Sequence, residues 1–152
     1  MKLNSLKDTF NFSKKIGKII SNGDIILLYG EIGVGKTTFV RGLINNLEIQ
    51  KRINKSQILS PTFNIMFQYE IKKLRIMHYD LYRIKHHKDM CELGIFNEIE
   101  NHITLIEWPE LIKKKPKNRI EMFFSYVGKD FDNRNIKFMG YGKWSNYDFK
   151  KI

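Results

Sequence analysis

The chain has 152 residues, 42% hydrophobic and 28% charged, and this ordinary balance excludes a disordered chain and a collagen-like fibre. Its longest apolar run, IILLY, is far too short to cross a bilayer, and its single cysteine, Cys91, cannot form an intrachain disulfide. The formal net charge is +11, from 27 Lys and Arg against 16 Asp and Glu, which would favour association with polyanions such as nucleic acids or nucleotides.

These properties predict one compact domain spanning residues 1–152. Because the N-terminus lacks a continuous apolar segment and the cysteine usage suits a reducing compartment, we expect a cytoplasmic protein that does not engage a membrane. The lysines are scattered along the chain, as a biased genome composition would also produce. Direct binding to nucleic acid therefore stays an open alternative.

The first predicted element is an amphipathic helix that ends at the turn residues NGD. Ser5 and Asp8 form a capping-box-like start to this helix. Residues 25–29 then form a continuous apolar run, which is typical of a strand buried on both faces of a parallel sheet. The apolar residues at helical spacing are Phe12, Ile16, Ile19 and Ile20.

A glycine-rich loop follows this strand. Residues 30–37, GEIGVGKT, match the phosphate-binding pattern G-x-x-x-x-G-K-[ST], and a second helix is predicted after them. Glycines let successive backbone N–H groups turn inward toward a polyphosphate, the lysine supplies a positive charge, and the Thr37 hydroxyl suits a Mg²⁺ ligand. The predicted nucleotide-binding residues of this motif are Glu31, Ile32, Gly33, Val34, Gly35, Lys36, Thr37 and Thr38.

The rest of the chain predicts further strands around this unit. Residues 63–71 and 74–82 read as an antiparallel hairpin beside the main sheet, and residues 103–106 as another buried strand. Leu93, Phe96 and Ile99 recur at helical spacing. Residues 119–127 and 134–140 predict a final strand pair around the turn GKDFDN. The expected fold is α/β and P-loop NTPase-like, with a mainly parallel central sheet, flanking helices and an added antiparallel hairpin.

Two acids are candidates to hold Mg²⁺ or to orient a water molecule, because such groups sit at the ends of strands that neighbour the phosphate loop. Glu107 closes the apolar run ITLI, and Asp80 closes the segment LRIMHY. Each has a structural alternative. Glu107 could cap the turn into WPEL, and Asp80 could pair with Arg83 at the edge of the hairpin.

Thr62 and Trp108 are further candidates. Thr62 follows Pro61 in a predicted loop, where a hydroxyl could sense the terminal phosphate, or could simply cap its own turn. Trp108 follows Glu107 and could stack on a base, contact a partner or belong to the core. The histidines lack the spacing of a zinc site and read as ordinary, and Cys91 is predicted to be buried and inert.

Taken together, the segments GEIGVGKTTFVRG, SPTF, HYDLYR, ELG and IEWPE, in this order and at these separations, resemble the TsaE (YjeE-type) ATPases. The resemblance covers residues 6–127, and beyond Val127 only Arg134 fits the family pattern. It implies a small P-loop ATPase that binds ATP and Mg²⁺. It also implies the partners TsaD and TsaB, with which the family makes the threonylcarbamoyl modification at adenosine 37 of tRNA.

The resemblance also implies residue roles. Lys36 would bind phosphate, Thr37 and Glu107 would bind the metal, and Asp80, Glu107 and Thr62 would be catalytic. Trp108 joins the functional residues, and Thr9 falls where the family approaches the adenine. Hydrolysis would reset the TsaD–TsaB assembly rather than form the threonylcarbamoyl bond.

Three rival functions compete with this one. A small-molecule kinase usually closes an arginine-rich lid over the phosphates, and Arg83 and Arg119 are isolated. A GTPase is expected to carry N-K-x-D, and the nearest string, NKSQ, lacks the aspartate. A binding module that uses ATP only to dock on a partner stays open, because the residues needed for hydrolysis also serve binding.

Overall fold

A computed structural model describes residues 1–128 and 130–149 of the chain. The helices are α1 (Leu6–Gly17), α2 (Lys36–Gln50) and α3 (His87–Glu92), with short 3-10 turns at Ile99–Asn101, Pro109–Leu111 and Gly142–Trp144. The strands are β1 (Lys2–Leu3), β2 (Ile25–Tyr29), β3 (Met66–Ile71), β4 (Leu74–Asp80), β5 (Ile103–Glu107), β6 (Arg119–Val127) and β7 (Asp130–Tyr141).

The described strands form one seven-stranded sheet in the order β1-β7-β6-β2-β5-β4-β3. Strands β6, β2, β5 and β4 pair in parallel at its centre, whereas β1–β7, β7–β6 and β4–β3 are antiparallel. The α/β class, the parallel centre and the antiparallel hairpin are therefore confirmed. Antiparallel pairing makes up more of the sheet than expected. Strands β7 and β1 extend one edge, and the β3–β4 hairpin forms the other edge of the same sheet.

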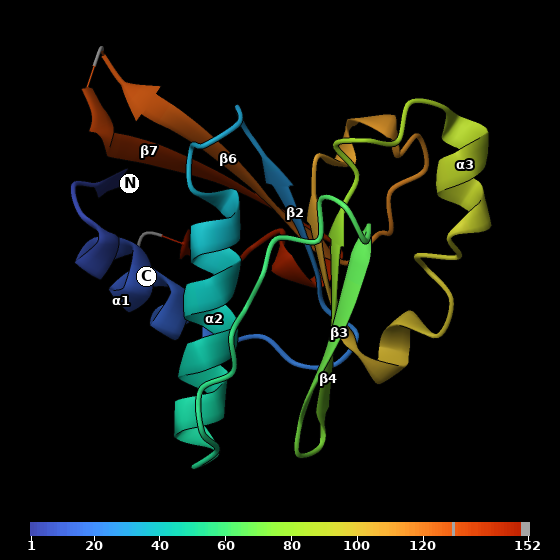
Figure 1. Cartoon of the computed structure of the whole chain (residues 1–152), viewed down its shortest axis with the longest axis horizontal. Coiled ribbons are helices and arrows are strands. Elements are labelled where there is room, and N and C mark those ends of the chain that lie inside the picture. Colours follow the sequence, from blue (N-terminus) through green and yellow to red (C-terminus); the bar gives the residue numbers. More distant parts are fainter. Residues whose placement is uncertain (129, 150–152) are drawn as a thin grey trace.

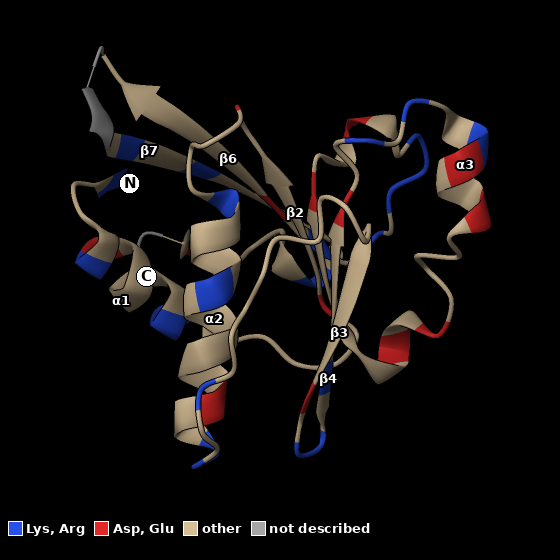
Figure 2. Ribbon diagram, viewed as in Figure 1, with Lys and Arg blue, Asp and Glu red and all other residues tan. Residues whose placement is uncertain are grey.

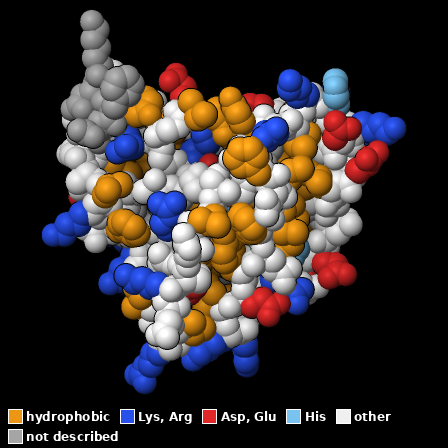
Figure 3. All heavy atoms as spheres, viewed as in Figure 1, with side chains coloured by type: hydrophobic (Ala, Val, Ile, Leu, Met, Phe, Trp, Pro, Cys, Tyr) orange, Lys and Arg blue, Asp and Glu red, His pale blue; other side chains and the backbone are white. Residues whose placement is uncertain are grey.

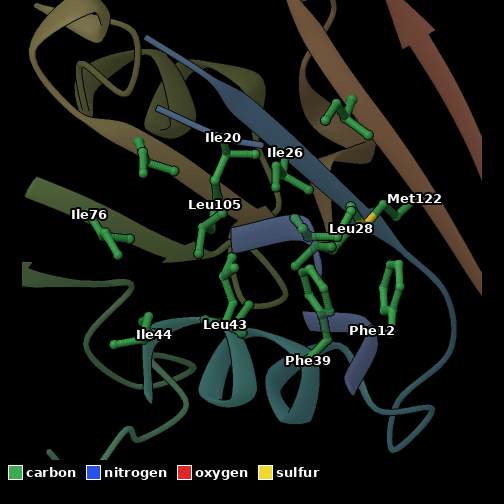
Figure 4. Close-up of a cluster of buried hydrophobic side chains, with 14 of the residues drawn as sticks. Phe12, Ile20, Ile26, Leu28, Phe39, Leu43, Ile44, Ile76, Leu105 and Met122 are labelled. Carbon is green, nitrogen blue, oxygen red and sulfur yellow. The ribbon is translucent and has the colours of Figure 1, made fainter. Parts of the chain in front are cut away.

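Helices cover both faces of the sheet, with α1 and α2 on one side and α3 on the other (Figure 1). Alternate residues of β2 separate two hydrophobic clusters: Ile26 and Leu28 pack on the side of α1 and α2, and Ile25 and Leu27 on the side of α3. Figure 4 shows the first cluster, in which Phe39 of α2 and Phe12 of α1 meet the sheet. This packing holds the start of α2 against the end of β2.

The predicted helix starts and turns are largely present. Ser5 caps α1, since the Asp8 backbone N–H donates to its Oγ at 3.1 Å. Strand β3 begins at Met66 rather than at residue 63, because Ile65 has a left-handed φ of 67° that turns the chain just before the ladder. The helical spacing of Leu93, Phe96 and Ile99 overstates the helix: α3 ends at Glu92, and Gly94 then adopts φ 57°.

Strand β6 has the predicted bounds, residues 119–127, whereas β7 is longer than the predicted residues 134–140. Strand β7 already pairs at Asp130 with Val127, so the connection is shorter than the six-residue turn GKDFDN. Part of that turn, residue 129, lies outside the described residues. Within the described part of the chain, every helix is too short or too polar to traverse a bilayer.

Candidate functional site

Three strand ends bring the candidate residues together. In the parallel pairing Glu107 lies opposite Leu28 of β2 on one side and opposite Asp80 of β4 on the other. The carboxyl ends of parallel strands meet at one edge of a sheet, and ligands gather there in folds of this kind. The chain therefore places both acids at the edge from which the glycine loop departs.

The glycine loop joins β2 to α2 through three left-handed glycines. Gly30, Gly33 and Gly35 have φ of 135°, 77° and 106°, a region that residues with a Cβ rarely adopt. Arg134 of β7 holds the loop from outside, because its Nε donates to the Val34 carbonyl at 2.9 Å. Helix α2 begins immediately after Gly35, so the positive end of its dipole faces the pocket described below.

Lys36 is folded back onto the loop. Its Nζ donates to the carbonyl oxygens of Gly30 at 2.6 Å and Glu31 at 2.9 Å, and it lies 3.9 Å from the centroid of the Trp108 ring. Burial lowers the pKa of Lys36 below its ordinary value, and the nearby carboxylates of Glu107, Asp80 and Glu110 oppose that shift.

Glu107 is the centre of a buried hydrogen-bond network. The Thr37 hydroxyl lies 2.9 Å from each of its carboxylate oxygens, and Nε2 of His78 lies 2.9 Å from its Oε1. The other ring nitrogen of His78, Nδ1, is buried without a hydrogen-bond partner among the described atoms. This pattern assigns the ring proton to Nε2, which then donates to Glu107. The side chain thus contacts the phosphate-loop helix rather than capping the following turn.

Asp80 belongs to a second network. It accepts from the Thr62 hydroxyl at 2.6 Å, from Ser60 at 3.4 Å and from the Tyr82 backbone N–H at 2.9 Å. Arg83, which could have paired with Asp80, instead lies over the Phe63 ring at 5.0 Å. The loop before β3 is therefore tied to the acid at the end of β4.

These groups line one pocket of about 220 Å³. Its predicted members are Ile32, Gly33, Gly35, Lys36, Thr37, Thr38, Thr62, Asp80, Glu107 and Trp108. Trp108 is half-buried, and its ring packs against that of Tyr82 at 4.9 Å. Trp108 has a left-handed φ of 58°, a rare conformation for a residue of this size.

Three predicted residues do not line this pocket. Thr9 is buried in α1, and its hydroxyl donates to the Ser5 carbonyl at 3.3 Å. The side chain of Val34 is fully buried in the core, and Glu31 lines a separate surface groove with Val34. Glu31 contributes its backbone carbonyl to the Lys36 contacts, and the predicted role of the loop residues in binding phosphate through backbone N–H groups stays a prediction.

Sequence reasoning missed several side chains of the site. His78 read as ordinary because the histidines lack the spacing of a zinc site, although it is the first residue of the segment HYDLYR, two residues before Asp80. Ser60 and Tyr82 flank predicted residues and also line the pocket. The prediction that Cys91 is buried is wrong: the six-residue helix α3 leaves this residue exposed, with Sγ 3.4 Å from Nδ1 of His87.

The donor set of the pocket suits a Mg²⁺ ion. No cluster of three or more His, Cys, Asp or Glu side chains suited to a metal occurs among the residues that the structure describes. Mg²⁺ does not require one, because it takes oxygen ligands and keeps several waters beside one or two carboxylates and substrate phosphates. The Thr37 hydroxyl next to the Glu107 carboxylate fits that chemistry.

Comparisons with known proteins agree on one family. The family model for "Threonylcarbamoyl adenosine biosynthesis protein TsaE" matches residues 3–136. A relative from Rickettsia prowazekii, described as tRNA threonylcarbamoyladenosine biosynthesis protein TsaE, is 43% identical over 73% of this chain and 74% of its own length. A relative of the same description from Bacillus subtilis is 30% identical over 90% of this chain and 82% of its own.

The fold is also similar to a solved structure. The crystal structure of Bacillus subtilis YdiB superposes with a TM-score of 0.74 and 26% sequence identity. The match covers 94% of this chain and 85% of that one. The likeness therefore extends over nearly the whole chain.

Proposed function

The chain belongs to the TsaE family, and from this premise we propose that it binds and hydrolyses Mg-ATP in the biosynthesis of threonylcarbamoyladenosine in tRNA. The observation that carries the proposal is the pocket in which Lys36, Thr37 and Glu107 meet. A phosphate loop beside an acid at the end of a neighbouring strand is the arrangement that P-loop hydrolases require.

Each loop residue has a separate task in binding ATP. The backbone N–H groups of the loop and the start of α2 receive the phosphates, and Lys36 adds a positive charge held at the same place. Thr37 and Glu107 would hold Mg²⁺, which neutralises the charge of the β- and γ-phosphates. The rings of Trp108 and Tyr82, which pack against each other, give the pocket an aromatic wall.

Hydrolysis needs a group that orients the attacking water. We propose that Glu107 and Asp80 together orient this water. Hydrogen bonds hold the Glu107 carboxylate to His78 and Thr37, and the Asp80 carboxylate to Thr62 and Tyr82. Side chains fixed in this way lose little entropy when the substrate arrives. The link from Asp80 to Thr62 also connects the loop before β3 to the chemistry.

Exposed apolar side chains around the pocket support a role for partner proteins. Ile32, Phe63 and Tyr82 are 71%, 82% and 50% exposed, and Ile32 and Tyr82 line the pocket itself. Figure 3 shows hydrophobic side chains gathered over the middle of the face it displays. Contiguous apolar surface beside a site is typical of a protein-docking surface. We propose that TsaD and TsaB cover it, that hydrolysis resets their assembly, and that this takes place in the cytoplasm.

Steady-state ATP hydrolysis, measured with and without TsaD and TsaB from the same source, tests the proposal. We expect slow turnover alone and strong stimulation by the pair. Turnover on a small acceptor without stimulation would instead indicate a kinase, and tight ATP binding without hydrolysis beside the partners would indicate a binding module.

Two variants assign the roles within the site. Lys36→Ala should abolish tight binding in an ATP titration, because it removes the phosphate charge. Glu107→Gln keeps the size of the side chain and should spare binding while lowering kcat by about a hundredfold or more. Unchanged affinity in the first variant would contradict the binding role, and undiminished turnover in the second would move the catalytic role to Asp80.

A further inference from the structure

One face of the sheet stays accessible over β6 and β7. Ile120, Met122 and Phe124 of β6 point into the cluster under α1 and α2, so the alternate residues of β6 lie on the other face. The hydrophobic cluster on the α3 side takes its strand residues from β2, β4 and β5, and includes none of the described residues of β6 or β7. α3 and its flanking segments therefore cover this part of the sheet only partly: Glu121 is buried, whereas Arg119 and Phe123 are half-buried.

The surface exposed there, here called the open face, consists of Lys115, Arg119, Phe123, Lys137, Met139 and Tyr141. The antiparallel register places Phe123 beside Lys137, and Arg119 beside Tyr141. Met139 is 39% exposed, Lys137 is exposed, and the Phe123, Arg119 and Tyr141 side chains are half-buried. The open face therefore alternates rings with cations.

Aromatic rings and cations are already stacked on this surface. The Phe123 ring lies parallel to the Tyr29 ring, with centroids 4.6 Å apart and an interplanar angle of 11°. The Arg119 guanidinium lies 3.7 Å over the Tyr141 ring, and Lys115 lies 5.2 Å from the centre of Tyr29. Because these side chains are already held in place, they lose little conformational entropy when a further ring stacks on them.

The charge of the open face is positive. The buried carboxylate beneath it, Glu121, pairs with Arg119 at 2.8 Å and with Lys115 at 3.4 Å. Lys115 and Arg119 carry two positive charges against the one negative charge of Glu121, and Lys137 adds another on the neighbouring strand. The excess positive charge can attract an anionic ligand. Figure 2 shows that Lys and Arg occur on most elements, so charge alone does not mark this surface. Single cation–ring pairs also occur elsewhere, as between Arg83 and Phe63, whereas the open face has two such pairs beside a stacked pair of rings.

We propose that the open face binds a single-stranded stretch of RNA, with bases stacked beside Phe123 and phosphates held by Lys115 and Lys137. Exposed sheet faces that combine aromatic and basic side chains suit unstacked bases, since every base offers a π-face and every linkage a negative charge. An acidic protein surface would use the lysines but not the rings. The inference rests on the proposed function only in identifying the RNA as a tRNA loop.

The open face also adjoins the ATP pocket. Tyr29, on which Phe123 stacks, is the last residue of β2, and the next residue is Gly30, whose carbonyl accepts from Lys36. Gly30 in turn lies against the backbone of Phe124 in β6. A base stacked beside Phe123 would thus lie next to a ring that packs on the strand carrying the glycine loop.

Fluorescence anisotropy with a labelled single-stranded oligoadenylate and with a labelled tRNA anticodon stem-loop tests the inference. Phe123→Leu keeps apolar volume but removes the ring, and should weaken binding about tenfold, the value of about one stacked base. Lys137→Glu should weaken binding several-fold and flatten its salt dependence. Lys14→Glu, on the exposed side of α1, makes the same charge change on the opposite face and should stay within about twofold of wild type.

Three outcomes would overturn the inference: wild-type affinity in Phe123→Leu, an equal loss in Lys14→Glu and Lys137→Glu, or full displacement of RNA by poly-glutamate at matched charge. If Phe123→Leu does not fold, the comparison of RNA binding by Lys137→Glu and Lys14→Glu still tests the inference. ATP titrations run in parallel separate the two proposals. Normal RNA binding by a chain that binds no ATP contradicts only the proposed function, and the reverse result contradicts only this inference.

Discussion

At the scale of single residues, the site includes a buried histidine, His78, whose role the segment HYDLYR did not indicate by itself. His78 and Glu107 are both almost fully buried and joined at 2.9 Å, on neighbouring parallel strands. A hydrogen bond of this kind fixes the orientation of the carboxylate that we propose as a metal ligand, much as outer groups orient the ligands of metal sites.

Replacing His78 by Leu tests that positioning role. The change removes the donor to Glu107, and we expect kcat for ATP to fall about tenfold to a hundredfold while KM changes little. His102→Leu is the matched control, because His102 is also buried but precedes β5, at the end of the strand far from Glu107. Equal losses in both variants would show a general stability effect instead.

Lys36 gives the site a pH dependence. Burial lowers the pKa of Lys36 below 10.5, so the lysine loses its proton at a lower pH than in the unfolded chain. ATP affinity should therefore fall as the pH rises through this lowered pKa. Because the unfolded chain binds the proton more tightly, the free energy of unfolding should rise with pH over the interval between the lowered pKa and 10.5.

The carboxylates provide the check. Among the nearby carboxylates, Glu107 raises the pKa of Lys36 the most. Glu107→Gln should therefore lower that pKa further and move the loss of ATP affinity to lower pH. ATP titrations across the alkaline range measure both curves. A shift to higher pH in the variant would contradict this electrostatic account.

At the scale of elements, the glycine loop determines how closely β2 and β6 approach. A Cβ on Gly30 would lie 2.5 Å from the Phe124 carbonyl oxygen of β6, a backbone atom that can give way only if the strands separate. Gly30 also has φ 135°, which an L-residue resists. Two independent penalties therefore fall on one position.

Gly30→Ala should lower the free energy of unfolding by about 3 kcal/mol or more, and weaken ATP binding. Gly128→Ala is the matched control: it has φ 66°, but a Cβ added there would meet no atom within 4 Å, so only the backbone cost of about 1–2 kcal/mol applies. Urea unfolding of both variants separates steric overlap from backbone strain. An equal loss of unfolding free energy in the two variants would mean that β6 can move away from the added Cβ at little cost.

At the scale of the whole molecule, the C-terminal segment after β7 is joined to the residue just before β2. Nε1 of Trp144 donates to Oδ1 of Asp24 at 2.9 Å, and Lys143 pairs with the same oxygen at 2.8 Å. Asp24 is fully buried just before β2, and Trp144 belongs to the main hydrophobic cluster. The segment beyond the family match, which ends at residue 136, therefore completes the core.

Trp144→Phe should lower the free energy of unfolding by about 1–3 kcal/mol, because it leaves part of a buried carboxylate without its donor. ATP affinity should stay unchanged, since Trp144 does not line the pocket. Urea unfolding and an ATP titration measure the two effects. Ser21 also donates to Oδ2 of Asp24, from its backbone N–H at 2.8 Å and its hydroxyl at 3.3 Å. A wild-type unfolding free energy would mean that Lys143 and Ser21 satisfy Asp24 without Trp144.

The sequence by itself determined the features that local chemistry controls. The glycine spacing identified the loop after β2, the acid after each apolar run identified Asp80 and Glu107, and the order of several motifs identified the family. Each of these signals lies within a few residues of the group it marks, because strand ends and helix starts are local.

Only the tertiary structure decided which of these groups meet and what supports them. His78 faces Glu107 because β4 and β5 pair in one register, and Arg134 reaches Val34 across 100 positions of sequence because β7 pairs beside β6. Thr9 is buried in α1 and Cys91 is exposed, because helix packing and helix length control the exposure of each side chain. Long-range pairing has no signal in local spacing, since it depends on which strands share an edge and at what register.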